Sequence, residues 1–167
     1  MNNIASLCAA ATLAVFAAGS ASAQTVTSVT GSITVIQPVL EVTKTSDLAF
    51  GSVVRPTSGS GTISIDANNG NVSTSNVARI GNTASRAAFS VVGQANANIQ
   101  VTYPSSVNIT RSGGSETLSI SLTSTMGGGQ INSGGTATFY LGGQVTLQST
   151  TVYGSYSGAF NVTVAYN

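Results

Sequence analysis

The residues that most often carry out chemistry in proteins are scarce in this chain. Its 167 residues contain no His, and the one Cys is Cys8, close to the N-terminus. A His-based triad, a thiolate nucleophile and a zinc site built from the usual ligands all need these residue types. The sequence beyond the N-terminal segment therefore excludes these classes of site.

Four carboxylates are the remaining candidates for acid-base chemistry: Glu41, Asp47, Asp66 and Glu116. Two converging carboxylates would be the minimum for a glycosidase. In this sequence each carboxylate lies at the edge of a predicted strand or in a turn, and the four come from different parts of the chain. We therefore expect no enzyme activity, no metal and no cofactor.

Glycine-rich stretches at residues 127–129, 134–135 and 142–143 raise the possibility of a phosphate-binding loop. Such a loop must be followed by a Lys-Ser/Thr pair and a helix. None of the three stretches has this continuation. We predict that all three are turns or bulges.

The charges argue against two classes of partner. Five basic and four acidic residues are scattered along the chain, with a formal net charge of +1. Nucleic acids and anionic lipid surfaces are usually recognised by clustered basic residues. We expect no nucleic acid partner. A nearly neutral surface of Ser, Thr, Asn and Gln fits either a protein that packs against its own copies or an ordinary neutral secreted protein.

The N-terminus has the pattern of an export signal. An apolar segment over residues 5–18 is followed by Ala21-Ser22-Ala23, a small-x-small cleavage site, so residues 1–23 are predicted to be a secretory signal peptide. The apolar segment has about 14 residues and would be roughly 21 Å long as a helix. A bilayer core is roughly 30 Å thick, so we expect export and no integral membrane span.

The C-terminal run, residues 154–167, shows the clearest periodicity. Phe160, Val162, Val164 and Tyr166 alternate with small or polar residues. Side chains of a strand point to opposite faces in turn, so this pattern predicts a half-buried strand that ends at the last residue.

Residues 24–37 show a similar pattern. Val29, Gly31, Ile33 and Val35 alternate with polar residues, so the apolar face has a single gap at Gly31. Pro38 interrupts the pattern because proline has no backbone donor for a sheet. We predict a separate N-terminal strand followed by a domain over residues 38–167.

The rest of the domain is predicted to consist of short strands separated by polar or glycine-rich turns. No 11-residue window after the leader holds a convincing helical stripe. Many short strands at this spacing favour an all-β, immunoglobulin-like sandwich. The predicted strands begin at Leu40 and then cover residues 62–66, 77–80, 88–92, 99–103, 107–110, 116–123, 137–141 and 144–148.

Three segments together resemble a known bacterial family. They are residues 42–51 (Val-Thr-Lys-Thr-Ser-Asp-Leu-Ala-Phe-Gly), residues 139–143 (Phe-Tyr-Leu-Gly-Gly) and the ending from Gly154 to the penultimate Tyr166. They resemble the secreted family catalogued as domain of unknown function 4402, which is similar to spore-coat-U-like proteins and archaic chaperone-usher pilins. Those pilins usually carry a Cys near the first core strand, where this chain has Leu40-Glu41-Val42.

The resemblance implies assembly by strand addition. The sandwich would lack one strand, and residues 24–37 of the next subunit would fill the groove. Val29, Ile33 and Val35 would be the plugs, that is, the apolar side chains that enter the groove. Gly31 would lie where the groove leaves little room. The groove would lie beside the C-terminal strand, with Gly154, Tyr156, Phe160, Val162, Val164 and Tyr166 as its candidate residues.

The implied protein is a subunit of a cell-surface pilus or fibre. Its partners would be copies of itself, a periplasmic chaperone that lends a strand before assembly, and an outer-membrane usher. The alternative keeps the fold: residues 24–37 turn back at Pro38 into their own groove, which gives a self-complemented surface or matrix adhesin.

Overall fold

A computed structural model describes residues 30–35 and 39–167. The chain divides into two units at Val35 and Ile36, and each is described by itself. The predicted leader, residues 1–23, and the predicted plug Val29 lie outside the described residues. Residues 30–35 carry no strand assignment, and the side chains of Ile33 and Val35 are 89% and 85% exposed.

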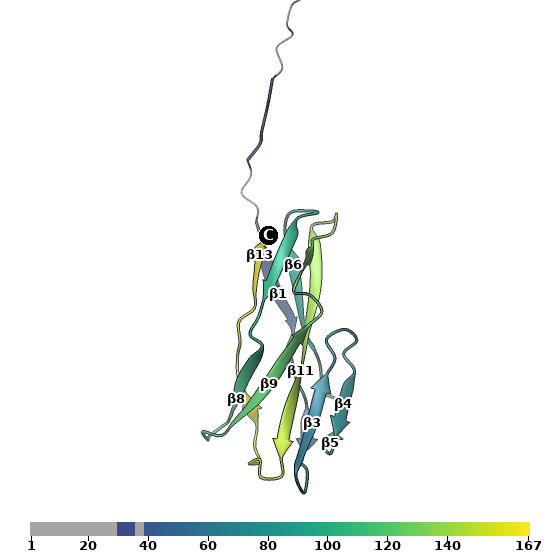
Figure 1. The fold of residues 1–167 in the computed structure, drawn as a ribbon, viewed down its shortest axis with the longest axis vertical. Coiled ribbons are helices and arrows are strands. Elements are labelled where there is room, and N and C mark those ends of the chain that lie inside the picture. The colour runs from purple at the N-terminus through teal and green to yellow at the C-terminus, as the bar shows by residue number, and fades with distance from the viewer. Residues whose placement is uncertain (1–29, 36–38) are drawn as a thin grey trace, which may run out of the picture. The chain divides into compact units, whose positions relative to one another are not determined.

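The domain that follows is built from strands, and the described residues contain no helix. Figure 1 shows their arrangement. The strands are β1 (Glu41–Ser46), β2 (Ser52–Val54), β3 (Ser60–Ile65), β4 (Val72–Ser75), β5 (Ala78–Ile80), β6 (Ala87–Val92), β7 (Asn98–Thr102), β8 (Ser106–Arg111), β9 (Thr117–Ser124), β10 (Gly128–Gln130), β11 (Thr136–Gln148), β12 (Tyr156–Ser157) and β13 (Thr163–Tyr166).

The long strand β11 organises the main sheet. Along one edge it pairs first with β6 and then, past Gly142, with β3, while β9 pairs with its other edge. The resulting eight-stranded antiparallel sheet runs β1-β6-β11-β9-β8-β12, with β3 and β4 attached beside β11. Figure 1 shows β3 and β4 next to the second half of β11.

Gly142 and Gly143 lie inside β11, so the predicted turn or bulge at this point is wrong. A Cβ on Gly142 would stand 2.2 Å from the carbonyl oxygen of Ile65, and one on Gly143 would stand 2.8 Å from that of Ser121. These glycines therefore permit close approach of neighbouring backbones. Residues 128–130 are likewise a strand, β10, whereas Gly135 does lie in a turn, with φ +76°.

The first half of the sheet is covered by a second layer. A three-stranded sheet, β10-β7-β13, supplies Ile99 and Val101 to a core shared with the large sheet. In that core Phe89 and Phe139 face each other in register, with ring centroids 4.9 Å apart. Both layers thus contribute fully buried residues, as in a complete sandwich.

The second half of the sheet is covered differently. Here the buried residues all come from β3, β9 and β11 of the large sheet. The segments that face them contribute only partly buried side chains, among them Phe50, Val53 and Phe160. The two-stranded ribbon β2-β5 is the only small sheet besides β10-β7-β13 in the described part of the chain. One half of the sandwich is therefore closed by two sheets and the other is covered only in part.

The fold is an all-β sandwich, as the sequence predicts; its immunoglobulin-like, pilin-like form stays a prediction. In the C-terminal run, Phe160, Val162, Val164 and Tyr166 are half-buried, and the residues between them are exposed, as the alternation predicts. The run is not one continuous strand, however. It pairs with β8 at residues 156–157 and with β7 at residues 163–166, and residues 158–162 between them belong to no strand.

Candidate functional site

The partly covered half of the sandwich contains an open groove. Its larger compartment has a volume of about 660 Å³. One wall is formed by residues 47–55 and the other by residues 151–160. The floor is the apolar inner face of the large sheet and contains Ile63, Val107, Ile109, Leu118, Ile120, Val145 and Leu147.

A smaller compartment of about 370 Å³ continues the groove toward β1. Val42 and Lys44 of β1 line one side, and residues 158–162 line the other. Asp47, Leu48, Gly158 and Phe160 line both compartments. We therefore treat the two as one continuous groove, called the groove below.

The walls of the groove carry unpaired backbone. Residues 158–162 make no backbone hydrogen bond within residues 30–35 and 39–167. On the opposite side, β1 pairs with β6 along one edge, and no strand of the described residues pairs with its other edge. Unpaired strand edges are templates for another strand. An extended peptide in the groove could therefore form backbone hydrogen bonds with the segments on both sides.

At the end of the domain where the C-terminus lies, two hydrogen bonds of Tyr166 hold neighbouring segments together. The hydroxyl of Tyr166 donates to the carbonyl oxygen of Val39 (2.9 Å) and accepts from the backbone N–H of Gln94 (2.8 Å). Gly93 makes room for this ring, since a Cβ there would stand 2.6 Å from the Tyr166 oxygen. Together with the pairing of β13 and β7, these bonds join the start and the end of the domain.

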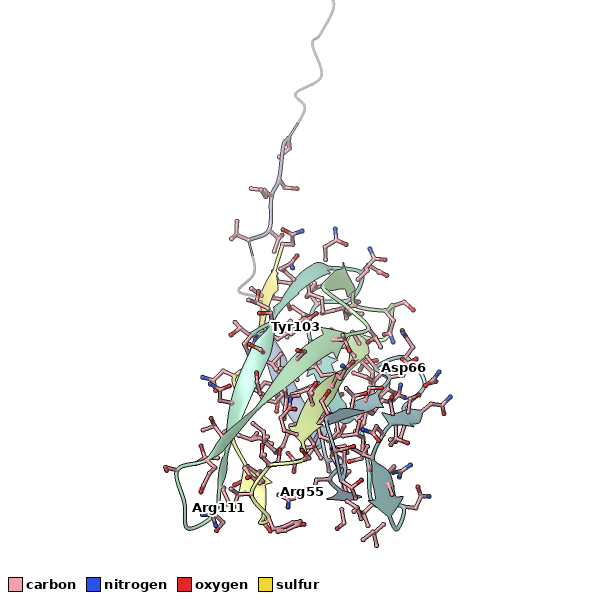
Figure 2. All side chains as sticks on the ribbon, turned by 60° about the horizontal axis from the view of Figure 1, so that its bottom comes forward. Arg55, Asp66, Tyr103 and Arg111 are labelled. Atoms are coloured by element: carbon pink, nitrogen blue, oxygen red, sulfur yellow. The ribbon has the colours of Figure 1, made fainter. Side chains whose placement is uncertain are left out.

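The other end of the groove is bordered by a cluster of arginine and tyrosine. The guanidinium of Arg55 lies 4.1 Å from the ring centroid of Tyr153 and donates to the carbonyl oxygen of Thr151. These contacts join one wall to the other. Nearby, Arg111 packs beside Gly154. Figure 2 shows Arg55 and Arg111 on the same side of the domain.

The charged groups around the groove have local partners. Lys44 pairs with Asp47, and the Nε of Arg111 donates to Glu116 at 2.7 Å. The hydrogen bond from Arg111 holds the pKa of the Glu116 carboxyl below its usual range. No group of three or more His, Cys, Asp or Glu that could hold a metal occurs in the described residues. The groove is thus an apolar trough with paired charges near its rim.

The structure brings together only some of the predicted groove residues. Gly154, Tyr156 and Phe160 line the larger compartment, and Phe160 and Val162 line the smaller one. Val164 and Tyr166 line neither. They pack against the core shared by the two sheets.

Gly158 lets the C-terminal wall lie close to β8, because a Cβ there would stand 2.7 Å from the carbonyl oxygen of Asn108. Of the predicted plugs, Ile33 and Val35 are exposed, and a Cβ on Gly31 would have nothing within 4 Å.

The sequence interpretation missed the opposite wall and the Arg55–Tyr153 contact. The alternation of Leu48 and Phe50 with Ala49 and Gly51 was a signal for the wall, because both large side chains line the larger compartment. No pattern in the sequence links Arg55 to Tyr153.

Comparison with known proteins adds one finding. The family model described as "Domain of unknown function (DUF4402)" matches residues 40–166. No match was found among curated proteins or among solved structures. No helix within the described residues has the length and apolarity needed to cross a membrane.

Proposed function

This chain belongs to the DUF4402 family, and we propose that it is an exported structural subunit of a cell-surface fibre of the pilus type. Residues 24–37 of one copy fill the groove of the next copy as an added strand. A chaperone would cover the groove before assembly, and an outer-membrane usher would release the growing fibre. The likeness of the C-terminal run to that of chaperone-usher pilins supports the same function.

The observation that carries this proposal is the one-sided core beneath the groove. Its buried residues come from the large sheet alone, and the space above them has a volume of about 660 Å³. A second strand over this floor would complete the sandwich in the way that β7 completes the other half. The free edges of β1 and of residues 158–162 would supply the backbone partners.

The N-terminal segment has the composition that such a groove requires. Ile33 and Val35 lie on one face of an extended segment and are 89% and 85% exposed. Burying each of these side chains would contribute about 1.5 to 3 kcal/mol. Each new backbone hydrogen bond would add a net of about 0.5 to 1.5 kcal/mol. Ordering a short segment costs about 1 to 2 kcal/mol per residue. The burial and hydrogen-bond contributions together exceed this cost only if most residues of the segment are buried or hydrogen-bonded in the groove.

A single charge on the plug face tests the proposal. Val35→Asp should abolish fibre formation by the mature chain, because an aspartate cannot be buried on the apolar floor without a partner. Thr34→Asp is the matched control: it places the same charge on the polar face and should leave fibres intact. Negative-stain microscopy and sedimentation measure both variants.

A peptide experiment separates a lost plug from a lost groove. The Val35→Asp chain keeps its groove and should bind a synthetic peptide of residues 24–38, with a rise in its melting temperature. The same peptide carrying Ile33→Asp and Val35→Asp should give no rise. Normal fibres from the Val35→Asp chain would overturn the proposal. A stable wild-type monomer whose own residues 24–37 are protected would instead favour the self-complemented adhesin.

A further inference from the structure

The length of the connection between the plugs and the domain restricts how two copies can meet. Only residues 36–38 separate Val35 from Val39. Four residue steps span at most about 13 to 14 Å even when fully extended. In a fibre of the proposed kind, Val39 of one copy must therefore lie within that distance of the point where Val35 leaves the groove of the next copy.

Tyr166 and Val39, which bond to each other, line neither compartment of the groove, whereas Arg55 and Tyr153 line the larger one. We therefore place the exit of the inserted strand at the end beside Arg55 and Tyr153. The inserted strand would then run antiparallel to residues 154–162. The two ends are far apart in one domain, because β11 extends from Thr136, the partner of Val92, to Gln148, which accepts a hydrogen bond from the backbone N–H of Thr151. Its 13 residues span about 40 Å.

Both ends expose apolar side chains. At the exit, Val54, Val152 and Tyr153 are 46%, 42% and 73% exposed. At the start of the domain, Val39 and Val92 are 77% and 50% exposed, and Glu41 lies in register with Val92. We call the first set, with Arg55, the exit face, and the second set, with Glu41, the leading face. The exit face carries a cation, and the leading face carries a carboxylate.

We propose that the leading face of one copy docks on the exit face of the next and forms a second interface beside the inserted strand. This inference rests on the proposed function, since the short connection forces the two faces together only in a strand-exchanged fibre. Contact between them would remove exposed apolar side chains from water and bring Glu41 toward Arg55. The fibre would then be stiff at each junction instead of hinged at residues 36–38.

Cysteine crosslinking tests the contact directly. Residues 24–167 contain no Cys, so an introduced pair is the sole source of disulfides in the mature chain. Val39→Cys with Tyr153→Cys, and separately Val92→Cys with Val152→Cys, should give a ladder of covalent multimers when fibres are oxidised and then boiled without reductant. Val39→Cys with Ser119→Cys is the control, because Ser119 is exposed on β9 and belongs to neither face. It should give at least tenfold less multimer.

A second measurement detects contact between the two faces even if their geometry does not allow a disulfide bond to form. The double variant Val39→Ser, Tyr153→Ser should still form fibres, with a persistence length in micrographs at least twofold shorter than that of the wild type. The second interface would be overturned if fibres form, neither cysteine pair gives more covalent multimer than the control, and the serine variant is as stiff as the wild type. The proposed function would then still stand. Absence of fibres from the wild-type chain would overturn both.

Discussion

Tyr166 makes the hydrogen bonds that hold the start of the domain against its end. Its hydroxyl bonds to the start of the domain at Val39 and to the β6–β7 turn at Gln94, while its ring packs against the core. These hydrogen bonds and the packing of the ring explain why a tyrosine occupies position 166. The ring and the hydroxyl join three segments that are distant in sequence.

Tyr166→Phe should lower the free energy of unfolding of the monomer by about 1 to 2 kcal/mol. The substitution keeps the ring and removes both hydrogen bonds, each with a net value of about 0.5 to 1.5 kcal/mol. Urea unfolding followed by tyrosine fluorescence or circular dichroism measures the difference. Tyr153→Phe is the matched control, because the Tyr153 hydroxyl has no hydrogen bond to any described residue, and its effect should stay within about 0.5 kcal/mol. Equal losses in the two variants would contradict this role of Tyr166.

The central strand β11 requires glycine at the point where its edge partner changes. A Cβ on Gly142 would meet the backbone at three atoms: the Ile65 oxygen at 2.2 Å, the Ala67 nitrogen at 2.6 Å and the Asp66 carbonyl carbon at 3.0 Å. Backbone atoms of the β3 edge cannot move away as a flexible side chain can. The passage of β11 from β6 to β3 thus depends on the missing side chain.

Gly142→Ala should destabilise the domain by about 2 to 3 kcal/mol or more, the upper range for an overpacked core. Gly127→Ala is the control, since a Cβ there has nothing within 4 Å and its backbone needs no left-handed conformation. That variant should be neutral or slightly more stable. Thermal or urea unfolding measures the stability of both variants. A Gly142→Ala chain as stable as the Gly127→Ala chain would show that β11 and β3 can move apart at this point without loss of stability.

Local patterns were sufficient to predict most strands and their faces. Ile63 with Ile65, and Ile120 with Leu122, point inward because period-two alternation is a local property of a half-buried strand. The same reasoning missed β2 and β4, which have three and four residues and little contrast between their faces.

It also divided β11 at Gly142 and Gly143, because glycine in a turn and glycine at a close backbone approach look alike in a sequence. The reason for each glycine lies in segments far away along the chain.

The groove could be predicted from one side only. The C-terminal wall has its own alternation. The opposite wall comes from residues 47–55, and the floor comes from β3, β8, β9 and β11, of which β11 contributes buried residues to both core clusters. Leu48, Tyr103 and Phe160 pack against both core clusters, so the boundary between the halves is set by tertiary contacts. At the scale of the whole molecule, one sheet thus has a complete cover over one half and an open trough over the other.

Hydrogen exchange in the assembled and unassembled states reports on this asymmetry. In the monomer the amides of residues 158–162 have no backbone acceptor among the described residues, and their exchange should be fast, whereas β11 pairs along both edges and should be strongly protected. Insertion of a strand beside them in the fibre would supply acceptors for alternate amides of this segment and of β1. Their exchange should then slow by at least tenfold, while that of β11 changes little. Mass spectrometry of peptic fragments from both states measures this. If residues 158–162 were already as protected in the monomer as in the fibre, or stayed as unprotected in the fibre as in the monomer, no strand would join the sandwich at this edge.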